Sequence, residues 1–296
     1  MHTLHSRSTS NKVKSFLIFL GFPLVILGMV RLITYYTSPQ DSLSISLIAL
    51  IISVVYGIIM YYSGSSIALA MNGCIPITRE SDKKIYRMVE NLCLTMGQDV
   101  PAIYLIQDDS LNAFATGRSP KHASIALTQG IINKLEDEEL EGVIAHELSH
   151  IKNYDTLVMI FTLIMINIIQ ILAEILLRAS FSSDHEGKNP IFLIASLGIY
   201  FFGGIIGFII QQAISRKREF LADSDGALLT RYPQGLANAL RKISGDARIE
   251  EIDGKRAFAS SYIANPLEPG FISKLFSSHP PIADRIRVLE SMGMDS

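Results

Sequence analysis

Long apolar stretches alternate with polar segments along the chain, and this alternation predicts the overall plan. A helix needs about 20 predominantly apolar residues to cross a bilayer. Four stretches approach this length: Phe16–Tyr36, Ile45–Met71, Leu157–Leu177 and Ile191–Ile214. The pattern therefore predicts an α-helical integral membrane protein with about four transmembrane helices, of which the last two form a hairpin.

Between the second and third apolar stretches the pattern becomes that of a small α+β domain. Ile85, Val89 and Leu92 recur at helical spacing, which predicts an amphipathic helix. Short β-prone runs separated by Asp, Ser, Gly and Pro then predict a small sheet. A polar helix over 133–155 follows, and we expect it to continue directly into the third apolar stretch.

These changes divide the chain into four regions. We expect an N-terminal tail with two transmembrane helices (1–71), a cytosolic catalytic region (72–155), a transmembrane hairpin (156–214) and a second cytosolic region (215–296). The high hydrophobic content, 49%, also favours a membrane protein. A net charge of -2 gives no reason to expect nucleic acid as a partner.

The positions of Lys and Arg predict the orientation in the membrane. The N-terminal tail carries Arg7, Lys12 and Lys14, whereas the loop "TSPQDSLS" carries no basic residue. Basic flanking segments tend to stay in the cytosol. The "SRKR" segment after the fourth stretch agrees with this orientation. We therefore expect a multi-pass protein of the cell inner membrane whose two larger polar regions face the cytosol.

The segment "GVIAHELSHIKNYDT" carries the strongest chemical signal. His146 and His150 are four residues apart, so on a helix they share one face and can bind one metal ion. Glu147 lies between them and can reach a metal-bound water as a base. The alternative is a polar helix that carries two surface histidines, and a third metal ligand is needed to decide.

Two glutamates are candidates for that ligand. Glu174 lies 24 residues beyond His150, and at about 1.5 Å per residue a continuous helix would place it ~36 Å away. Glu219 in "SRKREFLADSDGA" follows the predicted hairpin, which returns it to the side of the two histidines. Asp223, four residues later, could accept the N–H of a ligating imidazole. The alternative for "REFLAD" is a solvated helix start.

These motifs resemble the HtpX family of membrane-bound zinc metallopeptidases, which are relatives of the CAAX prenyl endopeptidase. The resemblance rests on "NAFATG", "HELSHIKNYDT", "SRKREFLADSDGA" and "SSHPPIADRI", which occur in this order and span most of the chain. It implies a zincin-like endopeptidase with a cytosolic active site that clears misfolded or damaged membrane proteins. By this resemblance His146, His150 and Glu219 bind one Zn²⁺ and Glu147 is the catalytic base.

Two further elements are candidates for the reaction. His279 is the candidate donor to the developing oxyanion, with Arg285 as its competitor, although Ser277–Pro281 also reads as a simple helix start. Asn112–Gly117 and Ser124–Thr128 are candidate strands for binding an extended polypeptide at a sheet edge. The second strand could equally be a buried core strand.

Two other functions fit part of the pattern. An intramembrane protease would hold its HExxH motif inside the bilayer, but the flanking "KLEDEELEG" is too charged for that depth. A catalytically silent, zinc-binding membrane scaffold or chaperone remains an alternative, although it would not need Glu147. The sequence gives no oligomeric state.

Overall fold

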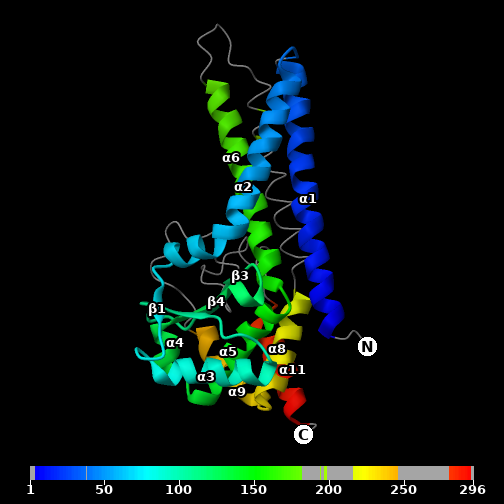
Figure 1. Cartoon of the computed structure of the whole chain (residues 1–296). Helices are drawn as coiled ribbons and strands as arrows, with labels where there is room; N and C mark the ends of the chain where they lie inside the picture. The colour runs from blue at the N-terminus through cyan, green and yellow to red at the C-terminus, as the bar shows by residue number, and fades with distance from the viewer. Residues whose placement is uncertain are drawn as a thin grey trace.

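The structure is a computed structural model that describes residues 4–37, 39–181, 194, 197–198, 216–245 and 280–294 (Figure 1). Two parts are visible in it. Long helices α1 (Leu4–Thr37), α2 (Ser42–Met71) and α6 (Asp155–Phe181) extend from a compact unit that holds the sheet and the other described helices. The molecule is thus mostly helical with a small sheet, as the sequence predicts.

Two of the long helices are apolar and long enough to cross a membrane, namely Asn11–Tyr35 of α1 and all of α2. Large apolar side chains such as Phe16, Leu20 and Ile51 are exposed on them, as expected for helices that face lipid. Helix α6 covers the predicted third span. The predicted fourth span lies almost entirely outside the described residues. The described part of the chain therefore supports membrane association through two candidate spans, and it does not establish four.

The sheet has four strands in the order β1-β2-β4-β3. Strand β4 (Ala123–Thr128) pairs in parallel with β2 (Ala102–Ile106) and antiparallel with β3 (Ala113–Gly117), and β1 (Ile75–Ile77) pairs antiparallel with β2. Strand β3 is therefore an edge strand and β4 an interior strand. Between β3 and β4 lies a short 3₁₀ turn, Pro120–His122, and α4 (Gln129–Lys134) follows β4.

Helix α3 (Lys83–Met96) forms where the amphipathic pattern predicts it. The Asp82 side chain accepts a hydrogen bond from the backbone N–H of Ile85, which caps the first turn. Gly97 ends the helix with a positive φ of 65°, a conformation that favours glycine. Its apolar face, which includes Val89 and Leu92, is buried in the main hydrophobic core.

Helix α5 (Asp137–Lys152) lies in the centre of the compact unit. Glu136 and Glu139 form a capping box at its start, and the acidic first turn suits the positive end of the helix dipole. The expectation that α5 continues straight into the third apolar stretch is wrong. The chain leaves the helix at Asn153, Tyr154 has a positive φ of 59°, and α6 begins at Asp155.

Three C-terminal helices complete the compact unit, namely α8 (Arg216–Thr230), α9 (Pro233–Gly245) and α11 (Ile282–Met294). Helices α8 and α9 pack against α5, and α11 packs against α9 and α8. Gly226 permits the close approach of α8, since a Cβ atom there would lie 3.1 Å from the backbone nitrogen of His146. Gly142 does the same for α9, where a Cβ atom would meet the backbone nitrogen of Leu236 at 2.8 Å. Small residues therefore bring α8 and α9 directly against the helix that carries the two histidines.

Candidate metal centre

The two predicted histidines lie side by side on α5. His146 is fully buried and His150 is 8% exposed. Their Nε2 atoms are 3.1 Å apart, and the ring planes are nearly perpendicular. Both rings therefore direct a nitrogen at the same point, as the four-residue spacing on a helix predicts.

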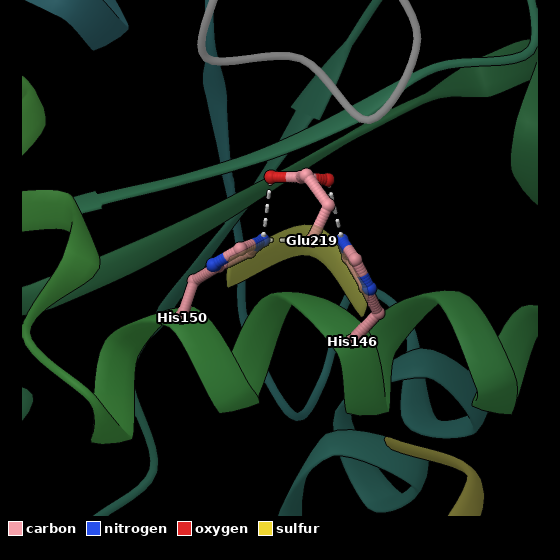
Figure 2. A group of neighbouring side chains, drawn as sticks. All are labelled: His146, His150 and Glu219. Carbon is pink, nitrogen blue, oxygen red and sulfur yellow. Dashed lines mark hydrogen bonds and ion pairs between the residues drawn. The ribbon is translucent and has the colours of Figure 1, made fainter. Parts of the chain in front are cut away.

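Glu219 on α8 completes this cluster. Its Oε1 lies 3.5 Å from His150 Nε2 and its Oε2 lies 3.6 Å from His146 Nε2 (Figure 2). Ligands about 2.0 to 2.1 Å from a tetrahedral metal ion are separated from one another by about 3.3 Å. The three separations observed here, 3.1, 3.5 and 3.6 Å, are close to this value. Two imidazoles and one carboxylate are also a donor set that zinc binds, so the residues fit a metal ion.

A carboxylate contacts the second ring nitrogen of each histidine. Asp223 Oδ1 lies 2.9 Å from His146 Nδ1, and Asp155 Oδ2 lies 2.9 Å from His150 Nδ1. A carboxylate at Nδ1 fixes the proton there and leaves Nε2 free to bind a metal. The contact of Asp223 was expected. Asp155 was not recognised from the sequence, although its position five residues after His150 was a possible signal.

Arg285 of α11 lies against this cluster and is fully buried. It donates two hydrogen bonds to Asp223, from Nε at 2.8 Å and from Nη2 at 2.7 Å, and its Nη1 is 3.5 Å from Glu219. The guanidinium group also lies 3.4 Å from the His146 ring nitrogens. The structure thus places Arg285, the competitor of His279, in contact with Asp223, whereas His279 lies outside the described residues.

The charges around His146 favour a bound cation. Burial by itself lowers the pKa of His146, but its hydrogen bonds to Asp223 and Glu219 raise it to about 9. Burial raises the pKa of Asp223, but the neighbouring charge of Arg285 and its hydrogen bonds outweigh burial and lower the pKa to about 2. Asp223 therefore carries negative charge at neutral pH, and its contact with His146 stabilises positive charge at that ring.

The structure distinguishes the two remaining candidates for the site, Glu147 and Glu174. Glu147 lies on α5 between the two histidines and is 2% exposed. Glu174 is on the exposed surface of α6 and pairs with Arg178, so it is not part of the cluster, as expected. The prediction excluded Glu174 by assuming one continuous helix. Because α5 and α6 are separate helices, the exclusion rests instead on the exposed position of Glu174.

The strand order decides between the two candidate substrate strands. Strand β4 has partners on both sides, so Ser124–Thr128 offers no free edge and the alternative of a core strand is correct. Strand β3 is at the edge and packs against α5 and α6. Its last carbonyl, at Gly117, accepts a hydrogen bond of 2.8 Å from Thr156 Oγ1.

An HExxH helix that meets a glutamate from a second helix defines a metallopeptidase. The comparisons agree. The sequence pattern of "Peptidase family M48" matches residues 78–293. A "Protease HtpX homolog" of Tropheryma whipplei (strain Twist) is 38% identical over 292 residues, which cover 98% of this chain and 99% of the relative. Another, of Bacteroides fragilis (strain YCH46), is 37% identical over 97% of this chain and 98% of the relative. The chain belongs to peptidase family M48, which confirms the resemblance seen in the sequence.

One solved structure supports the fold. The crystal structure of S. mikatae Ste24p superposes with a TM-score of 0.53 over 95% of this chain and 67% of that chain. The two sequences are 18% identical, so this similarity concerns the fold alone. The overall arrangement of helices and sheet in this chain is thus found in another solved protein.

Proposed function

We propose that the chain is a zinc-dependent endopeptidase of the inner membrane that hydrolyses misfolded or damaged membrane proteins at the cytosolic face. The observation that carries this proposal is the cluster of His146, His150 and Glu219, whose ligand atoms lie within 4.8 Å of one another. Asp155 and Asp223 orient the two imidazoles for metal binding.

Glu147 is the proposed base. His146, His150 and Glu219 would hold the zinc, which would supply a water with its pKa lowered toward about 7. Glu147, on the same helix as both histidines, takes the proton from the attacking water and delivers it to the nitrogen of the leaving amine. His279 remains the proposed oxyanion donor. The hydrogen bonds of Arg285 to Asp223 favour a positioning role for that arginine.

Strand β3 is the proposed binding edge for substrate. An extended polypeptide beside an edge strand gains hydrogen bonds to the main chain with little demand on its sequence. Ala113–Gly117 is the edge of the sheet next to α5, the helix that carries the HExxH motif. Recognition through the backbone would suit a protease that acts on many unfolded segments.

Two observations support a cytosolic site. The N-terminal tail carries the basic residues that favour the cytosolic side. The same end of α1 contacts the compact unit, because Asn11 donates a hydrogen bond to Asp155. The basic N-terminal end and the metal centre thus lie on the same side of the membrane. This supports the four-span arrangement, in which both polar regions face the cytosol.

The purified full-length chain tests the proposal. We expect one zinc per chain, and metal analysis should show its loss in His146→Ala, His150→Ala and Glu219→Ala. Glu147→Gln should keep zinc and lose cleavage of a casein-type substrate. Glu138→Gln, an exposed change on the same helix, is the matched control and should keep both. A wild-type chain that binds zinc but cleaves no polypeptide would favour the silent scaffold or chaperone instead.

A further inference from the structure

The junction between α5 and α6 is held by the first membrane helix. Asn11 of α1 is 6% exposed and donates hydrogen bonds of 2.8 Å to the backbone oxygen of Asn153 and to Asp155 Oδ1. The ammonium group of Lys12 lies over the ring of Tyr154, 4.2 Å from its centroid. Two consecutive residues of α1 therefore contact all three residues of the junction.

This junction has a conformation that the local sequence does not favour. Tyr154 has a φ of 59°, which is uncommon for a bulky residue and persists where surrounding contacts impose it. The turn at Tyr154 ends α5 and sets the direction in which Asp155 enters α6. Contacts to Asn153, Tyr154 and Asp155 thus act on the orientation of the Asp155 side chain.

Asp155 connects the junction to the metal centre. Its Oδ2 lies 2.9 Å from His150 Nδ1, and its Oδ1 accepts hydrogen bonds from Asn11 and, at 2.9 Å, from Arg218 Nη1. Arg218 directly precedes Glu219 in α8. One buried carboxylate therefore joins α1 to the helices that carry His150 and Glu219.

The length of α1 explains how a membrane helix can make these contacts. Its 34 residues span ~51 Å at ~1.5 Å each, whereas the hydrocarbon core of a bilayer is ~30 Å thick. The N-terminal turns extend beyond the span and lie beside the compact unit (Figure 1). Asn11 and Lys12 are the first two residues of the candidate span Asn11–Tyr35, directly next to this extension.

We propose that α1 is a positioning element of the metal centre as well as an anchor: Asn11 and Lys12 hold the α5–α6 junction so that Asp155 stays hydrogen-bonded to His150. This inference rests on the proposed metal centre. Loss of the Asn11 side chain leaves Asp155 less firmly held and His150 less well oriented, so zinc is bound less tightly. Residues that orient a ligand typically change metal affinity or activity by about 10 to 100-fold, and Asn11 acts one contact further away, so we expect about 3 to 10-fold.

Full-length protein in lipid nanodiscs provides the test. Metal retention is measured in a Glu147→Gln background, so that self-cleavage of the protein does not disturb the result. Asn11→Ala is compared with Thr34→Ala, which removes the buried hydrogen bond of 2.8 Å between Thr34 and Ser42 at the opposite end of α1. The probes are Zn²⁺ in competition with a chelator and the visible absorption spectrum of the Co²⁺-loaded protein, which reports on ligand geometry.

We expect Asn11→Ala to lose zinc more readily and to change the Co²⁺ spectrum, while Thr34→Ala matches the parent. Lys12→Ala, an exposed change that does not threaten folding, should act in the same direction with a smaller effect. Equal zinc retention in Asn11→Ala and the parent would overturn the inference, and so would an equal loss in Thr34→Ala, because general weakening of α1 packing would then be sufficient. A parent that binds no zinc would instead overturn the metal centre itself.

Discussion

Replacing Asp223 by Asn should affect both metal binding and folding, because this carboxylate serves two buried partners. Its Oδ1 lies within hydrogen-bonding distance of His146 Nδ1 and Arg285 Nη2, and its Oδ2 accepts from Arg285 Nε. An amide offers one oxygen and one NH₂ group, so the NH₂ group must face a donor. Arg285 therefore loses one of its two hydrogen bonds in either orientation of the amide, and His146 loses its acceptor when the NH₂ group takes the place of Oδ1.

Typical magnitudes for such contacts set the expected size of both effects. A ligating imidazole without its carboxylate typically loses about 10 to 100-fold in metal affinity or activity. Breaking a buried ion pair by removing one partner costs about 3 to 5 kcal/mol in the free energy of unfolding. Arg285 is fully buried and Asp223 is 0% exposed, so solvent does not compensate the remaining charge. We expect a loss near the lower end of that range, because Asn keeps one acceptor.

Two measurements separate these effects. Zinc affinity is measured by competition with a chelator, and stability by thermal unfolding of the metal-free protein in detergent micelles. The double variant Asp223→Asn with Arg285→Met removes the unpaired charge, so it should recover stability and still bind zinc weakly. Asp225→Asn is the matched control, because it makes the same chemical change two residues further along α8, where the side chain accepts a hydrogen bond from Asn153 at 3.2 Å. Normal zinc binding in Asp223→Asn, together with a defect in Asp225→Asn, would refute the assigned contacts.

Two other changes test the packing and the topology. Gly226→Ala should weaken zinc binding and lower the free energy of unfolding by about 1 to 3 kcal/mol, because its Cβ atom would meet the backbone nitrogen of His146 at 3.1 Å. An unchanged melting temperature would contradict this close approach. Single cysteines introduced into "TSPQDS" and "SSDHEGK", with Cys74 and Cys93 replaced, should react with an impermeant reagent from outside the cell, and protection of both loops would contradict four spans.

The local part of the metal site could be predicted from the sequence, and its long-range part only through the resemblance to a family. The spacing of His146 and His150 fixes their shared helix face, because neighbours four apart on a helix are set by backbone geometry. Glu219 lies 73 residues after His146, and no local pattern connects them. The predicted membrane hairpin and the family motif supplied that connection.

Asp155 was missed for a physical reason. The apolar pattern of "TLVMIFTLIMI" follows α5 so closely that a continuous helix is the simplest prediction. The break depends on Tyr154 in a left-handed conformation, which its residue type does not signal. Contacts from α1, distant in sequence, accompany this conformation. Strand order likewise depends on tertiary packing, so the interior position of β4 could not be read from alternation alone.

The separation of the metal ligands along the chain also bears on when proteolytic activity can arise during biosynthesis. His146 and Glu219 lie on either side of the chain segment predicted to form a membrane hairpin, and Arg285 contacts His146 across 139 residues. Domains emerge from the ribosome N-terminal part first. The HExxH helix is therefore made well before the glutamate and arginine that complete its surroundings. With the proposed ligand set, a partly synthesised chain that lacks Glu219 would have no complete metal centre, so it would not cleave neighbouring nascent proteins.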